Sequence, residues 1–186
     1  MPSSNVDKIP MVIRQAQKFE PHKILDVGVG FGKYGMLLRE YLELLVPAER
    51  QQDPCYLRSR WTRTIHGIEI FGDFLQDWHR CFYDEIFVGD VREILPTLLP
   101  DYDLVLLCDV LEHMDMPEAL AVLYYCERIS AHVIVSLPAG EYPQEKLFGN
   151  EHEKHRSTWY APDLSSRGYA VQTSRGEQGP WLVAWR

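Results

Sequence analysis

The sequence lacks the features that mark several specialised classes of protein. Its four cysteines stand far apart with no CxxC spacing, and two of them fall within apolar runs, so we interpret them as reduced core thiols. No apolar run approaches the roughly 18 residues that span a bilayer, and the N-terminus lacks the basic flank and apolar core of a signal peptide. We therefore expect a soluble, cytoplasmic protein that binds no membrane.

Positive charge is also scarce, with 19 lysines and arginines against 27 aspartates and glutamates and a net charge of −8. This balance disfavours a protein that binds nucleic acid over its whole surface, although a local basic pocket is compatible with it. The sequence has no repeat, no low-complexity tract and no obvious linker. With 186 residues, 46% of them hydrophobic, the chain is most simply one domain, 1–186, that buries a full core.

Apolar runs of strand length alternate with segments of helical periodicity along most of the chain. The expected strands are 23–28, 64–71, 85–90, 102–110 and 131–138, and the expected helices are 34–45, 73–82, 91–99 and 116–129. Such alternation indicates an α/β protein with a parallel sheet covered by helices on both sides. The tail predicts a closing antiparallel pair, 168–175 and 180–186, and we expect residues 1–20 to form an N-terminal helical cap.

A polar insertion at 47–63 separates the first helix from the second strand and contains two prolines. The simpler interpretation is a surface loop, because long loops cost little conformational entropy. The alternative is a lid whose guanidinium groups bind a carboxylate or phosphate on the substrate. The lid residues would be Arg50, Tyr56, Arg58, Arg60, Trp61 and Arg63.

Alternate glycines follow the first expected strand in the segment DVGVGFG, which begins at Asp26. Glycines here allow a sharp turn and let a ligand approach the main chain at the carboxyl end of the sheet. A phosphate-binding P-loop would need glycine where Val27 stands and serine or threonine where Tyr34 stands, so that interpretation fails twice. A dinucleotide fingerprint, GxGxxG, does occur at 30–35, but a lone match is weak. The pattern DxGxGxG fits this loop better, because it includes every special residue except Gly35.

With this motif, the sequence resembles the class I S-adenosylmethionine-dependent methyltransferases, whose first motif is an apolar strand, an acid and GxGxG. Three further segments support the resemblance in the right order: IHGIEI, VGDV and LVLLCDVLEHM, the last in a form typical of small-molecule methyltransferases. The resemblance covers roughly residues 23–137. It implies a doubly wound, mostly parallel seven-stranded sheet with helices on both faces, the Rossmann-like methyltransferase fold. It also implies S-adenosyl-L-methionine as the cofactor.

The resemblance also assigns roles to residues at the strand ends. Glu69 would accept hydrogen bonds from the ribose hydroxyls, Asp90 would hold the adenine amino group, and Val91 would lie beside the base. The alternatives are a surface or salt-bridged role for Glu69 and a helix N-cap role for Asp90, and the second is compatible with adenine binding. The full set of expected cofactor-binding residues is Asp26, Gly28, Gly30, Gly32, Glu69, Ile70, Asp90, Val91 and Asp109.

His113 directly follows the DVLE segment and is the best candidate for a catalytic base, if the acceptor must lose a proton. Its alternative role is a histidine that packs at a helix start. The fourth-strand motif lacks the Asn/Asp-Pro-Pro-Tyr/Phe sequence found in methyltransferases of adenine and glutamine, so we expect a small-molecule acceptor, methylated at oxygen or nitrogen.

The segment 141–165 lies where the family places acceptor-binding elements, and we expect His155 and Trp159 to contact the acceptor. It contains HEKH, in which the second histidine comes one residue too early for a zinc-protease HExxH motif. His152 and His155 have a spacing that a shared metal would permit, but a helix cap in a hydrogen-bonded loop is simpler, and we expect no metal.

The leading hypothesis is therefore a small-molecule methyltransferase. Two alternatives remain open at this stage. One is a non-catalytic module that binds S-adenosylmethionine, and the other is an NAD-dependent oxidoreductase, favoured only by the GxGxxG match. The sequence gives no oligomeric state.

Overall fold

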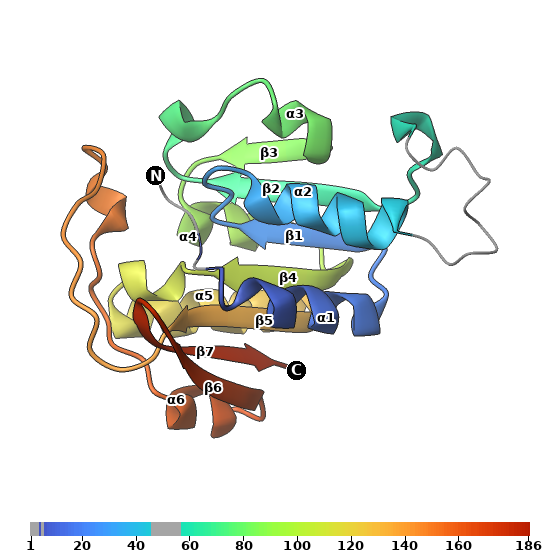
Figure 1. Cartoon of the computed structure of the whole chain (residues 1–186). Helices are drawn as coiled ribbons and strands as arrows, with labels where there is room; N and C mark the ends of the chain where they lie inside the picture. The colour runs from blue at the N-terminus through green and yellow to red at the C-terminus, as the bar shows by residue number, and fades with distance from the viewer. Residues whose placement is uncertain (1–3, 5, 46–56) are drawn as a thin grey trace.

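A seven-stranded sheet organises the described part of the chain, which comprises residues 4, 6–45 and 57–186 of this computed structural model (Figure 1). The strand order is β3-β2-β1-β4-β5-β7-β6. The first five strands in this order are mutually parallel, and β7 runs antiparallel to both of its neighbours. The predicted fold class is confirmed. The strands are β1 (Lys23–Val27), β2 (Thr64–Glu69), β3 (Glu85–Val88), β4 (Tyr102–Cys108), β5 (Ser130–Pro138), β6 (Ala170–Gly176) and β7 (Gly179–Trp185).

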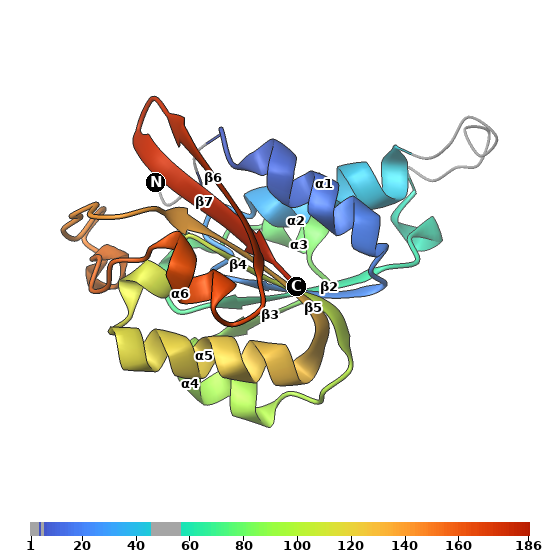
Figure 2. The ribbon, with the colours of Figure 1, turned by 90° about the horizontal axis from the view of Figure 1, so that it is seen from below.

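Helices cover both faces of this sheet. Figure 2 shows α1, α2 and α3 on one face and α4 and α5 on the other. The helix α5 spans the residues that its periodicity predicts, and a capping box between Asp115 and Glu118 begins it. The helices are α1 (Ile9–Phe19), α2 (Lys33–Arg39), α3 (His79–Phe82), α4 (Val91–Ile94), α5 (Met116–Ile129) and α6 (Ala161–Ser165). None of the described helices is long and apolar enough to cross a membrane.

Two hydrophobic cores lie on opposite faces of the sheet. Along β4, Leu104 and Leu106 pack into the core beneath α1 and α2, whereas Val105 and Leu107 pack into the core beneath α5. Successive side chains of a strand point to opposite faces, so a strand buried on both sides must be apolar throughout. This explains the uninterrupted apolar run at 104–107.

The segment expected as one helix at 73–82 is broken. A 3₁₀ turn (Gly72–Phe74) is followed by extended backbone at Leu75, and the α-helix begins only at His79. The buried His79 ring accepts a hydrogen bond from Gln76 N at 2.9 Å, and its Nε2 donates to Gly30 O at 3.0 Å. These bonds tie the segment to the glycine loop, so local helical periodicity is overridden.

The described part of the insertion lies at the end of the sheet where the parallel strands begin (Figure 1). Arg58 donates to the carbonyl oxygens of Arg80 and Tyr83, and Arg63 donates to those of Pro21 and Leu42. The lid interpretation is therefore wrong for Arg58 and Arg63, because these arginines bind backbone at the opposite end of the strands from the loop at 28–32. Arg50 and Tyr56 lie outside the described residues.

Candidate functional site

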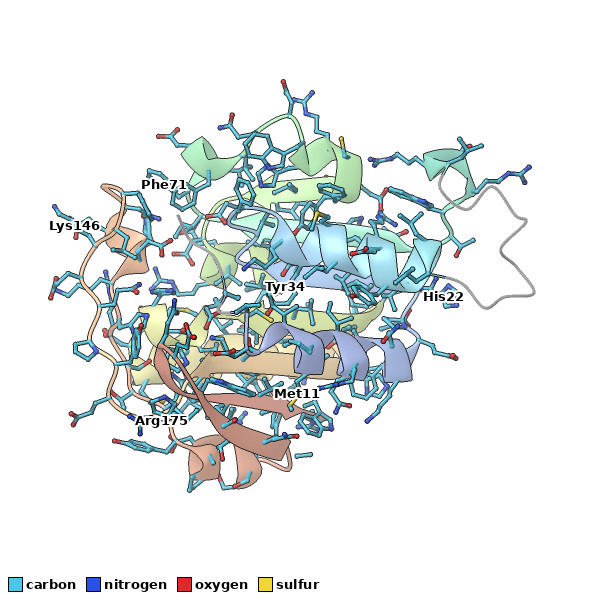
Figure 3. The ribbon with its side chains drawn as sticks, in the orientation of Figure 1. Met11, His22, Tyr34, Phe71, Lys146 and Arg175 are labelled. Carbon is cyan, nitrogen blue, oxygen red and sulfur yellow. The ribbon has the colours of Figure 1, made fainter. Side chains whose placement is uncertain are left out.

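A cavity of about 320 Å³ lies at the carboxyl ends of the parallel strands. Its wall combines the loops after β1, β2, β3 and β4 with the N-terminal segment, the turn between β6 and β7 and the segment 142–156. Figure 3 places Phe71 and Lys146 at this end of the sheet and His22 at the opposite end. The volume falls in the range of small-molecule sites, and the position is where doubly wound sheets bind ligands.

The glycine loop adopts a backbone that requires glycine. Gly28, Gly30 and Gly32 have φ angles of 79°, 51° and 83°. A Cβ atom added to Gly28 would lie 2.6 Å from a methyl group of Val110, and Gly28 N donates to Ile68 O at 2.9 Å. Gly28 and Gly30 line the cavity, but Gly32, the third predicted glycine, does not. A Cβ atom added to Gly32 would lie 2.9 Å from the His79 ring.

Glu69 ends β2 beside this loop, where the sequence predicted an acid. Its side chain is buried, Oε2 accepts from Gly30 N at 2.7 Å, and Oε1 accepts from Phe71 N at 2.9 Å. Burial raises the pKa of Glu69. Because each carboxylate oxygen has two lone pairs, both can accept a further bond from a ligand. Ile70 also lines the cavity.

Asp26 lies behind the glycine loop, and the residues that line the cavity do not include it. Its Oδ2 accepts from the Tyr83 hydroxyl at 2.5 Å, and the same hydroxyl oxygen accepts from Gly35 N at 3.0 Å. Burial raises the pKa of Asp26 to about 7. A Cβ atom at Gly35 would lie 2.4 Å from the Tyr83 ring, which explains the fourth glycine of the loop.

Asp90 and Val91 occupy the end of β3 and the start of α4. Asp90 is the N-cap of α4 and accepts from Arg92 N at 2.8 Å, as its alternative role predicted. The Arg92 side chain also binds Asp90 and Glu118, and its hydrogen bond lowers the pKa of Asp90. Asp90 and Val91 both line the cavity, so the capping role is compatible with the predicted adenine-binding role.

Asp109 directly follows β4 with a φ of 57° and forms an ion pair with Lys8. Lys8 is 3% exposed, and both residues line the cavity. Sequence reasoning missed Lys8, because it treated the N-terminal segment only as a cap. The available signal was a lysine directly before the apolar stretch IPMVI. If that stretch packs into the core, the lysine is buried with it and needs a partner, since lysine is almost never fully buried without one.

Three ligand-type side chains converge at one end of the cavity. Glu112 and His113 belong to a 3₁₀ helix, η6 (Leu111–His113), and His155 follows another, η7 (Glu151–Glu153). The rings of His113 and His155 lie 4.9 Å apart between centroids. Burial lowers the pKa of His113 to about 4, with His155 contributing, and burial lowers the pKa of His155 as well. Both imidazoles are therefore neutral near pH 7.

Trp159, predicted to contact the acceptor, lies in the hydrophobic core instead. Its side chain is 1% exposed, and its Nε1 donates to Ser157 Oγ at 3.0 Å. Because a large aromatic side chain gains most from full burial, Trp159 anchors the loop to the core and is not part of the cavity wall. His155 does line the cavity, as predicted.

No family model matches the chain, and neither does any curated protein. Solved structures do match. The N-terminal domain of EvdMO1 with SAH bound is 15% identical, with 98% of this chain and 81% of that chain covered and a TM-score of 0.64. The methyltransferase domain of bacterial CtHen1 is 20% identical, with 97% and 98% covered and a TM-score of 0.58. Magnesium protoporphyrin IX methyltransferase from Synechocystis PCC 6803, also with bound SAH, is 14% identical, with 96% and 81% covered and a TM-score of 0.58. These likenesses show that the chain has the Rossmann-like fold of methyltransferases.

Proposed function

We propose that this chain is an S-adenosylmethionine-dependent methyltransferase that acts on a small-molecule acceptor at oxygen or nitrogen. One observation carries the proposal: the buried Glu69 carboxylate binds Gly30 N of a glycine loop at the wall of the cavity. An acidic side chain and a backbone that a ligand can approach closely therefore lie together, at the end of the sheet where a methyltransferase fold binds its ligand. Two of the solved neighbours carry SAH, which supports the choice of cofactor.

The residues around the cavity fit the proposed cofactor. The loop at 28–32 is packed so closely that a Cβ atom at Gly28 would lie 2.6 Å from Val110, and its glycines let a ligand approach the main chain. Glu69 would hold the ribose hydroxyls, while Asp90 and Val91 would bind the adenine. When bound, the cofactor supplies a methyl group activated by a positive sulfur, so the protein has mainly to align the reactants and exclude water.

Asp26 would support this site indirectly. Through Tyr83 it holds Gly35 N, and thus the start of α2, against the segment that precedes β3. We propose that Asp26 shapes the loop from behind, in place of direct contact with the cofactor. Asp109 faces the cavity beside Lys8 and remains a proposed cofactor-binding residue.

The acceptor would enter between η6 and the segment 142–156, where Tyr142, Gln144 and Arg156 line the cavity with His155. His113 is the proposed proton acceptor there. Its Nδ1 lies 3.4 Å from the Lys154 carbonyl oxygen and would donate to it, which leaves the lone pair on Nε2. Burial weakens this histidine as a base, so alignment of the acceptor is its more important contribution.

Calorimetry with S-adenosylmethionine and its demethylated product tests the proposal. Glu69→Gln removes a charge that accepts hydrogen bonds, so its affinity should fall about 10- to 150-fold, the equivalent of about 1.5–3 kcal/mol. Glu85→Gln, an exposed glutamate at the start of β3, is the matched control and should bind normally. Equal affinity in the two variants would contradict the assignment of Glu69.

Turnover separates the remaining alternatives. A screen of acceptors with a labelled methyl donor should give product, whereas a binding module would give none. Titration with NADH should show no fluorescence change, because Gly35, the last glycine of the dinucleotide match, is already explained by the Tyr83 ring that packs on it.

A further inference from the structure

Glu112, His113 and His155 each offer one ligand atom, and these atoms all lie within 4.8 Å of one another. Backbone hydrogen bonds join the two chain segments that carry them. Arg156 N and Ser157 N donate to the Glu112 carbonyl oxygen at 2.7 and 3.1 Å. The convergence of the three side chains is therefore built into the path of the main chain and does not depend on surface side chains.

Both imidazoles are oriented by carbonyl groups behind them. The Nδ1 atom of His155 lies 2.6 Å from Tyr142 O, and that of His113 lies 3.4 Å from Lys154 O. A carbonyl oxygen only accepts, so each Nδ1 must carry the hydrogen and each Nε2 keeps its lone pair. A backbone carbonyl on the second nitrogen is the arrangement found in metal-binding histidines.

The Glu112 carboxylate has no hydrogen-bond partner in the described part of the chain. Its side chain is 2% exposed, and neither of its oxygens forms a hydrogen bond within the described residues. A carboxylate buried in this way is unfavourable unless something compensates its charge. Asp109 and Glu153 lie near enough to act on Glu112, and the nearby Lys8 is already paired with Asp109. A cation bound beside Glu112 would supply the partner that its carboxylate lacks among the described residues.

We propose that Glu112, His113 and His155 form a binding site for a divalent transition-metal ion such as Zn²⁺. Two imidazole nitrogens and one carboxylate oxygen suit such ions better than Mg²⁺ or Ca²⁺, which prefer oxygen ligands alone. Three protein ligands also leave coordination positions open, and all three residues line the cavity. The chain would then bind a metal, contrary to the expectation from its sequence.

The geometry needs only a small adjustment. Zinc bonds of about 2.0–2.2 Å place the ligand atoms of a tetrahedron about 3.3–3.6 Å apart, so the observed cluster must contract by at most about 1.5 Å. Rotation of three side chains supplies such a movement. A bound ion would take the lone pair that was assigned above to proton transfer, so His113 would then act as a ligand and not as a base.

Metal titration of the whole chain, freed of metal with a chelator, tests the proposal independently of methyl transfer. Co²⁺ serves as a spectroscopic probe through its visible absorption, and Zn²⁺ binding is measured by calorimetry. Wild type should bind one equivalent. Glu112→Gln and His155→Asn should each lower the affinity at least about 100-fold, since loss of mere supporting partners already costs 10- to 100-fold.

His152→Asn is the matched control, because His152 lies three residues before His155 and is not part of the cluster. It should leave the affinity unchanged. Absence of saturable binding in wild type, or an equal loss in His152→Asn, would overturn the proposal. Circular dichroism checks that each variant folds, and His113→Asn replaces any variant that does not. Affinity for the demethylated cofactor, measured on the same samples, shows whether the proposed function fails separately.

Discussion

Asp26→Asn should change how the stability of the protein depends on pH. Asp26 is buried behind the glycine loop with one hydrogen bond, from Tyr83, and its other oxygen has none within the described residues. The pKa of Asp26 is about 7 in the folded protein against an ordinary value of 3.8. The folded state therefore binds a proton more tightly than the unfolded state, so stability falls as pH rises from about 4 to 7 and then levels off.

The size of the effect follows from linkage. With those two pKa values, wild type should lose about 2 to 3 kcal/mol of unfolding free energy between pH 5 and pH 8 through this one carboxyl group. Asn cannot ionise but still accepts the Tyr83 hydrogen bond, so Asp26→Asn should lack this loss. Urea denaturation followed by circular dichroism across this range measures the difference between the two proteins. A difference that stays constant with pH would refute the reasoning.

Tyr83→Phe provides the opposite perturbation. It removes the hydroxyl that donates to Asp26 and accepts from Gly35 N, so two buried groups lose their partner. We expect a destabilisation of about 2–6 kcal/mol, from about 1–3 kcal/mol for each stranded group. The loss of that hydrogen bond also raises the pKa of Asp26 further. The pH-dependent decline should consequently extend above pH 7, and a decline that ends at the wild-type pH would contradict this account.

Two further substitutions test other parts of the site. Gly28→Ala should destabilise the protein and weaken cofactor binding, because its φ of 79° is strained for alanine and its Cβ would lie 2.6 Å from Val110. Gly149→Ala has a similar φ of 77°, but no described residue lies within 4 Å of its Cβ, so it controls for strain alone and should retain full affinity. Lys8→Met should cost about 1.5–3 kcal/mol in thermal or urea denaturation, because it leaves the half-buried Asp109 carboxylate without its ion-pair partner. Adding Asp109→Asn should recover most of that loss, and a strictly additive double variant would exclude the coupling.

The sequence predicted the architecture well, because the sheet is buried on both faces and the strands are therefore apolar runs. It also placed Glu69 and Asp90 correctly at strand ends, since topology alone brings the carboxyl ends of parallel strands to one edge. The prediction failed at 73–82, where His79 binds Gly30 O across 49 positions of sequence. No local periodicity can record a contact of that kind.

The same limit explains the missed and misassigned site residues. Tyr83 reaches Asp26 from 57 positions away, and Lys8 reaches Asp109 from 101 positions away. Trp159 stands in a polar stretch, which suggested exposure, yet its side chain is buried in the core. Sequence neighbours describe the polarity of a segment, whereas the direction of one large side chain depends on packing that only the fold supplies.

The backbone bonds that hold the segment 142–156 have a consequence for how this protein can diversify. His155 N donates to Gln144 O, and the Gln144 side chain donates to Glu153 O, so both ends of the intervening stretch are tied to each other. Between these ties, residues 145–149 are all exposed. Changes in the length or sequence of this exposed tip should therefore leave the position of His155 unchanged. They would alter the cavity only where Leu147 lines it.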